Sequence, residues 1–396
     1  MMTARITPNA DLVDSTAEPD LESLLETMQG LCGICPAGCG VTISLEHGRI
    51  RRLTPLKSRS NHVPISEKAE SPDSLVGQPQ GIGCPRGTRA PEIVYSPDRL
   101  LYPLKRVGPR GAGRFERVSW DEALDTVAGL FKQVAAQYGP QAVAVYTGRG
   151  TFERSLCDLL TPAGVRTSSA WNVLFPFGSP NTTGVGAICY VAHGVLAPAT
   201  TLGIWDADTY ADLEQADLIV VWGDNPATDS SPVNLIRLKA AQKRGAELVV
   251  IDPRRSETAR ATRARWLGIR PGTDGALALG MLQVIIEEQL YDRDFVEQWT
   301  VGFAELVVYV AQFTPERVEQ ITFVPAAEIR RLARSLAQAK GAALLSYTGL
   351  EYTNSGTQNI RAILTLWALT GNLDVPGGKV IHMPDAEFPI NQSMRL

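Results

Sequence analysis

The sequence lacks several features that would assign it to a membrane-spanning or nucleic-acid-binding class. No apolar run approaches the roughly 18 residues that a spanning helix needs, and the longest, residues 276–286, predicts a core helix instead. Lysine and arginine (38) do not exceed aspartate and glutamate (42), and the net charge is −4 with histidine neutral. Without a basic surplus we expect no nucleic-acid partner, and without a long apolar run we expect no membrane span.

The amino terminus also lacks the signs of an export signal. Residues 1–28 are acidic and polar, with no basic segment, apolar segment or small-residue cleavage site. The arginine pairs all lie inside the chain, so no twin-arginine signal is visible. These absences predict a cytoplasmic protein.

The composition predicts a folded chain of more than one domain. At about 150 residues per domain, 396 residues correspond to two or three domains. Hydrophobic residues make up 44% and charged residues 20%, both near the globular norm. A wholly disordered or collagen-like chain is therefore excluded, and no internal repeat is visible.

Three of the six cysteines fall within eight residues. Cys32, Cys35 and Cys39 have the spacing C-x2-C-x3-C, and Cys84 follows after 44 residues. One tight loop can present three thiolates to an iron–sulfur cubane, and a remote fourth thiolate closes the site. Zinc is an alternative, although structural zinc sites usually use two C-x2-C knuckles, and buried inert thiols are another. The pattern favours a [4Fe–4S] cluster.

The hydrophobic pattern predicts an α/β fold. Alternation over residues 41–53 indicates a hairpin, and Ser119-Trp-Asp-Glu122 is a capping box that begins a helix ending at Gly139. Apolar strands at 218–222 and 247–251 flank a predicted helix at 232–243, which implies a parallel crossover. The further elements that we expect are strands at 142–146 and 342–347 and helices at 325–339 and 359–369.

Polar segments follow three of the predicted strands, and in open α/β sheets ligands bind beyond such carboxyl ends. Gly223 allows close approach, and polar residues before the next helix suit a pyrophosphate. Asp252 is placed to accept hydrogen bonds from ribose hydroxyls, and Asp274 to pair with the N–H edge of guanine. Each segment alone fits an ordinary turn or a helix cap equally well.

Together with the four-cysteine motif, these segments resemble the amino-terminal part of a molybdopterin oxidoreductase of the DMSO reductase superfamily. The resemblance runs from about residue 31 to residue 380. Its markers keep the family's order: the cluster motif, Ser96-Pro-Asp-Arg-Leu100, Ser119-Trp-Asp-Glu-Ala123, Gly223-Asp-Asn-Pro226, Asp252-Pro-Arg254, Arg270-Pro-Gly-Thr-Asp274, and Leu369-Thr-Gly-Asn372 with Pro376-Gly-Gly378.

The resemblance implies two cofactors, a [4Fe–4S] cluster and a bis-molybdopterin guanine dinucleotide that carries Mo or W. The ligands of the cluster would be Cys32, Cys35, Cys39 and Cys84. The residues that would bind the dinucleotide are Gly223, Asn225, Pro226, Asp252, Arg254, Thr273 and Asp274. A small-molecule substrate and an electron-transfer partner protein follow from the same resemblance.

The resemblance also gives catalytic roles to Cys189 and Arg86. Cys189 lies eight residues after Asn181, at the kind of spacing where family members place the metal ligand, and a soft thiolate suits Mo or W. Arg86 follows Cys84 by two, where related enzymes carry a cation between cluster and pterin. A fixed cation there would stabilise added electron density. The alternatives are a small buried cysteine and a surface arginine. Tyr190 stands where formate dehydrogenases have histidine, which speaks against formate oxidation.

The implied architecture is a small iron–sulfur domain followed by parallel-sheet α/β domains. We expect an iron–sulfur domain at 1–100 with an insertion loop at 54–80. It is followed by a discontinuous α/β domain at 101–175 and 305–396. A dinucleotide-binding α/β domain occupies 176–304. By the same resemblance, we expect the family's β-rich carboxy-terminal domain to be missing. Three explanations for its absence stay open: the sequence is a fragment, it is one part of a split enzyme that a second chain completes, or it is a domain retained for electron transfer alone.

The expected function is a molybdopterin-dependent oxidoreductase. It would move two electrons between a small substrate at Mo or W and the [4Fe–4S] cluster. The sequence resembles most the thiosulfate and polysulfide reductase and formate dehydrogenase branches. The alternative is a non-catalytic iron–sulfur subunit for electron transfer or scaffolding, against which the presence of Cys189 counts.

Overall fold

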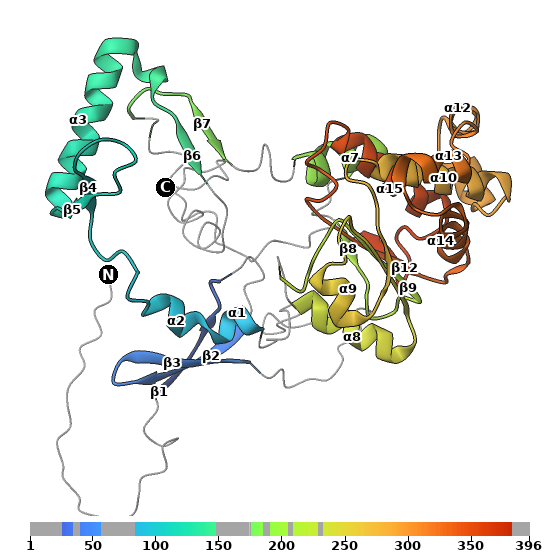
Figure 1. Ribbon diagram of the computed structural model, residues 1–396, viewed down its shortest axis with the longest axis horizontal. Helices are drawn as coiled ribbons and strands as arrows, with labels where there is room; N and C mark the ends of the chain where they lie inside the picture. Colours follow the sequence, from blue (N-terminus) through green and yellow to red (C-terminus); the bar gives the residue numbers. More distant parts are fainter. Residues whose placement is uncertain are drawn as a thin grey trace, which may run out of the picture. The chain divides into compact units, whose positions relative to one another are not determined.

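The computed structural model describes most of the chain, in two compact units (Figure 1). The described residues are 26–34, 40–56, 84–147, 174, 176–184, 191–204, 209–228 and 233–381. The first unit comprises Met1–Cys32 and Cys39–Arg99, and the second comprises Gly33–Gly38 and Leu100–Leu396. Three predicted site residues, Cys35, Cys39 and Cys189, lie outside the described residues, as does most of the predicted insertion loop.

The first unit contains a three-stranded antiparallel sheet in the order β1-β2-β3. Its strands are β1 (Glu26–Leu31), β2 (Gly40–Glu46) and β3 (Arg49–Pro55). The two residues of the β2–β3 turn, His47 and Gly48, have φ angles of 49° and 74°, which suits a tight hairpin. The predicted hairpin is confirmed. Strand β1 was not predicted, because its sequence shows no clear alternation of polar and apolar residues.

Two short helices complete the described part of the first unit. They are α1 (Pro85–Thr88) and α2 (Ala90–Val94). Tyr95, directly after α2, accepts a hydrogen bond through its hydroxyl oxygen from the Ile50 backbone N–H at 2.7 Å. The Arg49 guanidinium lies 4.2 Å from the centre of the Tyr95 ring. Tyr95 therefore joins the helical segment to β3.

The second unit is built on a four-stranded parallel sheet in the order β11-β10-β9-β12. The strands are β9 (Leu218–Trp222), β10 (Glu247–Ile251), β11 (Arg265–Leu267) and β12 (Ala342–Ser346). Helix α8 (Val233–Arg244) connects β9 to β10. The predicted parallel crossover is therefore confirmed.

Helices cover both faces of this sheet (Figure 1). Alternate residues of β9 enter different cores: Val220 belongs to one hydrophobic cluster and Val221 to the other. The larger core contains side chains of α10 (Asp274–Glu287), α14 (Ala326–Gln338) and α15 (Gly356–Leu369). The smaller core contains side chains of α8 and α9 (Glu257–Thr262). The mixed α/β fold with a parallel sheet agrees with the sequence expectation.

The larger core is extended by shorter elements. They are α7 (Ala197–Thr201), α11 (Arg293–Trp299), α12 (Phe303–Val310) and α13 (Pro315–Thr322). A separate antiparallel pair joins β8 (Thr209–Ala211) to β13 (Lys379–Ile381). Among the described residues, no helix combines the length and the hydropathy needed to cross a bilayer.

The segment that begins at Leu100 contains a hairpin and a long helix. The hairpin pairs β4 (Leu104–Arg106) with β5 (Phe115–Arg117), and α3 (Trp120–Tyr138) follows. The Ser119 hydroxyl accepts the Glu122 backbone N–H at 3.1 Å, which confirms the predicted helix start. The strand expected at 142–146 begins later, as β6 (Val145–Thr147), because a 3₁₀ turn occupies Pro140–Ala142. Strand β6 pairs in parallel with β7 (Thr182–Gly184).

Candidate cofactor site

Two of the four motif cysteines meet in the first unit. Cys32 directly follows β1, and Cys84 caps the amino terminus of α1, where its sulfur accepts the Gly87 backbone N–H at 3.3 Å. A Cβ atom added to Gly87 would lie 3.4 Å from the Cys32 sulfur and 3.7 Å from the Cys84 sulfur. Both thiols are buried and free of disulfides. The glycine therefore leaves space next to two converging sulfurs.

The donor set at this position fits a metal centre of soft ligands. Thiolates are the ligands of iron–sulfur clusters and of structural zinc, and an N–H bond to a cysteine sulfur is one way in which a protein tunes a cluster. In the part of the chain that the structure describes, no three histidine, cysteine or acidic side chains gather as a metal-binding group. Cys35 and Cys39, the other two motif cysteines, lie outside that part. Arg86 lies on α1 and is exposed.

Gly223 directly follows β9 and has a φ of 65°. A Cβ atom there would lie 3.2 Å from the Cα of Gly349, in the loop that follows β12. The Gly349 backbone N–H donates to the Gly223 carbonyl oxygen at 3.0 Å. The close approach that this glycine allows is therefore made by a neighbouring backbone of the same protein.

Asn225 is buried, and both its amide nitrogen and its amide oxygen form hydrogen bonds within the protein. Its amide nitrogen donates to Thr228 Oγ1 at 2.7 Å and to Glu257 Oε2 at 2.8 Å. Its amide oxygen accepts the backbone N–H of Thr258 at 3.0 Å and the Thr258 hydroxyl at 2.7 Å. Pro226, the next residue, is buried. The side chain of Asn225 is thus fully used by contacts with the protein itself.

Asp252 and Arg254 follow β10. Asp252 is half-buried, and its Oδ1 accepts the Arg254 backbone N–H at 2.9 Å. Burial raises the pKa of Asp252 above its ordinary value. The Arg254 guanidinium forms an ion pair with Glu257 at 3.0 Å. Hydrogen bonds, first from Arg254 and then from Asn225, lower the pKa of Glu257 to about 2.

Asp274 begins α10 and is only 5% exposed. The indole N–H of Trp222, the last residue of β9, donates to Asp274 Oδ1 at 2.9 Å. Burial raises the pKa of Asp274, and the charge of Asp252 raises it further. The Thr273 hydroxyl does not cap α10 but donates to the Arg270 carbonyl oxygen at 2.7 Å.

The carboxyl edge of the sheet therefore carries two acidic side chains that interact electrostatically. Asp252 follows β10, and Asp274 is bonded to the end of β9. Ionised carboxylates only accept hydrogen bonds, so the edge suits a ligand that offers hydroxyl or N–H donors. This is the position where open α/β sheets bind nucleotides.

Sequence reasoning missed two residues at this edge. Glu257 contacts both Asn225 and Arg254, and its position in the first turn of α9, after the cap Ser256, was the available signal. His193 lies in a π-helical segment, Val191–Leu196, and its Nε2 is 2.8 Å from the hydroxyl of Ser346 at the end of β12. His193 is buried and follows the predicted metal ligand Cys189 by four residues.

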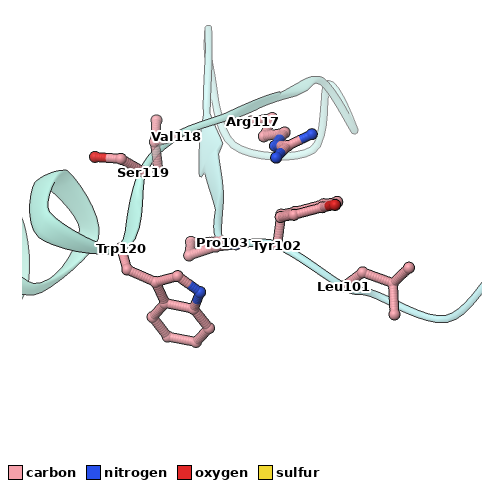
Figure 2. A pocket seen from close by; sticks show the side chains of 7 residues that line it. All are labelled: Leu101, Tyr102, Pro103, Arg117, Val118, Ser119 and Trp120. Atoms are coloured by element: carbon pink, nitrogen blue, oxygen red, sulfur yellow. The ribbon is translucent and has the colours of Figure 1, made fainter. Parts of the chain in front are cut away.

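A surface pocket of 620 Å³ lies in the segment that begins at Leu100 (Figure 2). It is lined by Leu101, Tyr102, Pro103, Arg117, Val118, Ser119 and Trp120. The Arg117 guanidinium stacks 3.2 Å from the centre of the Tyr102 ring. The lining is mostly apolar, which does not suit a charged dinucleotide.

Comparison with known proteins gives a family model and several relatives. The model described as "Molybdopterin oxidoreductase" matches residues 99–386. A dimethyl sulfoxide reductase of Escherichia coli (strain K12) is 33% identical over 358 residues, which are 82% of this chain and 43% of the relative. An acetylene hydratase of Syntrophotalea acetylenica is 35% identical over 334 residues, 83% of this chain and 43% of the relative.

A solved structure agrees with these matches. The acetylene hydratase from Pelobacter acetylenicus superposes with a TM-score of 0.68 at 31% sequence identity, and the match covers 89% of this chain and 44% of that one. The fold of the chain is therefore that of a known protein. The chain spans less than half the length of these relatives.

Proposed function

The chain belongs to the molybdopterin oxidoreductase family, within the DMSO reductase superfamily, and on this premise we propose that it acts as a molybdenum- or tungsten-dependent redox subunit. It would move two electrons between a small-molecule substrate and a [4Fe–4S] cluster. The observation that carries the proposal lies at one edge of the parallel sheet, inside the matched region. Asp252 follows β10, and Asp274 is bonded to Trp222 at the end of the neighbouring strand β9.

The sheet edge would hold the guanosine end of a molybdopterin guanine dinucleotide. Asp252 would accept from the ribose hydroxyls, and Asp274 from the N–H groups of guanine. The bond from Trp222 fixes the Asp274 carboxylate through Oδ1. The loop at Gly223, Asn225 and Pro226 would lie against the phosphates, with Arg254 and Thr273 beside the nucleoside.

The cysteine motif would hold the cluster. The convergence of Cys32 and Cys84 at Gly87 supports a shared metal centre, and Cys35 and Cys39 would supply the remaining thiolates. A [4Fe–4S] cluster supplies one-electron transfer when it is bound. Arg86, on the same short helix as Gly87, would stabilise the added negative charge.

Cys189 would be the protein ligand of Mo or W. A thiolate is the ligand type that such soft sites favour. His193 supports a role for this segment, because its contact with Ser346 brings the chain just after Cys189 to the carboxyl end of β12. Electrons would leave toward a partner protein. A polypeptide corresponding to the unmatched part of the relatives would complete the site, and a cytoplasmic location stays a prediction.

The substrate class stays a small molecule. One relative is named for reduction of dimethyl sulfoxide and another for hydration of acetylene, at similar identity to this chain. The thiosulfate or polysulfide preference suggested by the sequence therefore stays a prediction.

Metal and nucleotide content tests the proposed function. Protein purified anaerobically, with the polypeptide that completes it, is expected to contain Mo or W together with guanosine monophosphate released by acid. Substitution of Cys189 by alanine is expected to abolish turnover and to leave the iron content unchanged. Iron without any Mo or W, or unchanged turnover in the alanine variant, would favour the non-catalytic electron-transfer alternative.

A further inference from the structure

Two of the predicted dinucleotide-binding residues, Asn225 and Arg254, are held by the same acidic side chain. From this arrangement we propose that Glu257 is a positioning residue that fixes the loops after β9 and β10 in the shape that receives the dinucleotide. This inference rests on the proposed function and deepens it, because it assigns a role to a residue that the family markers do not include.

The carboxylate of Glu257 determines how the Asn225 amide is oriented. The amide nitrogen must face the carboxylate, because a carboxylate accepts hydrogen bonds and donates none. The amide oxygen then faces the backbone N–H of Thr258. A flipped amide would set its oxygen against the carboxylate and its N–H₂ group against the Thr258 N–H. Both contacts would then be lost together.

The oriented amide joins two loops that are 33 residues apart in the sequence. Thr258 is fully buried and bonds the amide oxygen of Asn225 through both its N–H and its hydroxyl. The Ala227 backbone N–H donates to the same threonine hydroxyl at 3.0 Å. These bonds are formed by the protein alone, so the loops hold their shape before a ligand arrives, which lowers the entropic cost of binding.

Two cations hold the carboxylate of Glu257 in place. Arg254 lies 3.0 Å from it and Arg260 lies 2.8 Å from it. The first turn of α9, where Glu257 lies, also favours a negative charge. Glu257 therefore stays ionised at neutral pH and connects Asn225, Arg254 and α9 at one point. In this account Asn225 acts on the ligand through the shape of its loop and not through its side chain.

The inference can be tested by exchanging the amide of Asn225 and the carboxylate of Glu257. Asn225→Asp sets two carboxylates against each other, and we expect hydrogen exchange of the Thr258 amide to accelerate by about tenfold or more, which corresponds to about 1.4 kcal/mol. Bound guanosine monophosphate is expected to fall by a similar factor. The double variant Asn225→Asp with Glu257→Gln restores a carboxylate–amide pair and is expected to recover both quantities to within about twofold.

Controls separate a positioning role from general instability. Glu316→Gln removes another exposed glutamate that is paired with an arginine, Arg330, and is expected to change neither readout. Thermal unfolding of every variant verifies that the chain is folded, and Glu257→Gln alone provides a milder variant. Equal loss in Asn225→Asp and in the double variant would overturn the inference, as would faster Thr258 exchange without loss of nucleotide. Absence of nucleotide from the unaltered protein would overturn the proposed function instead.

Discussion

Helices α14 and α3 have the same kind of amphipathic pattern, but they differ in how far the apolar face is buried. In α14 the apolar residues Leu332 and Leu336 are completely buried in the larger core. In α3 no residue is buried, and Leu124 and Leu130 are 61% and 53% exposed. Hydrophobic periodicity therefore predicts a helix, whereas the burial of its apolar face depends on a partner surface. For α3 the described residues supply only a small part of that surface, such as the Phe177 ring, which lies 5.7 Å from the ring of Phe131.

The exposed apolar surface continues beyond α3. Trp120 at the start of the helix is 65% exposed, and it lines the pocket together with Leu101 and Tyr102 (Figure 2). The carboxyl edge of the sheet has the opposite character, with buried and hydrogen-bonded polar groups such as Asn225 and Asp274. Both side chains are hydrogen-bonded within the protein itself, and the proposed dinucleotide site would lie beside them.

The largest effect is expected from a cavity in the sheet region. Leu332→Ala removes a fully buried side chain, and we expect the free energy of unfolding to fall by about 2 to 5 kcal/mol. Chemical denaturation followed by circular dichroism measures the change. A loss as small as that of a surface substitution would mean that α14 is not packed on the sheet as described.

An intermediate, pH-dependent effect is expected at Asp274. Its pKa is raised in the folded protein above the ordinary value of 3.8, mainly by burial. The folded state therefore binds this proton more tightly than the unfolded state, and ionisation costs stability as pH rises above 3.8. Asp274→Asn keeps an acceptor for the Trp222 N–H and removes that cost.

Stability curves of the two proteins check this expectation. The asparagine variant is expected to gain stability over the unaltered chain as the pH is raised from mildly acidic to neutral, and to lose bound guanosine monophosphate. A variant that loses stability at neutral pH would show that the ionised carboxylate is a structural group and not one retained for a ligand.

The smallest effect is expected on α3. Leu124→Ala removes a side chain that is mostly exposed, and the change in unfolding free energy is expected to stay within about 0.5 kcal/mol. The same denaturation experiment as for Leu332→Ala measures it, so the two leucines form a matched pair. A cost comparable to that of Leu332→Ala would show that the apolar face of α3 is covered in solution, which would remove the contrast.

Local patterns predicted much of the fold. The alternation around His47 predicted the hairpin, the capping box at Ser119 predicted the start of α3, and continuous apolar runs predicted β9 and β10. These features depend on a few neighbouring residues, so a sequence window contains the necessary information. The family markers located the sheet edge for the same reason, because each is a short motif.

Features that depend on distant residues were not predictable. The space that Gly223 leaves is filled by Gly349, which is 126 positions away. Glu257 contacts Asn225 only because the loop after β9 reaches the first turn of α9. Strand β1 forms because β2 is available to pair with it. None of these partners is visible in the local sequence.

Metal analysis is the strongest test of the iron–sulfur cluster proposed at the cysteine motif. Protein purified anaerobically is expected to contain about four iron atoms per chain, as a cluster of the [4Fe–4S] type requires. Cys84→Ala is expected to lose this iron, and Cys157→Ala, which alters a cysteine outside the motif, is expected to keep it. Stoichiometric zinc in place of iron, or iron that survives Cys84→Ala unchanged, would contradict the account.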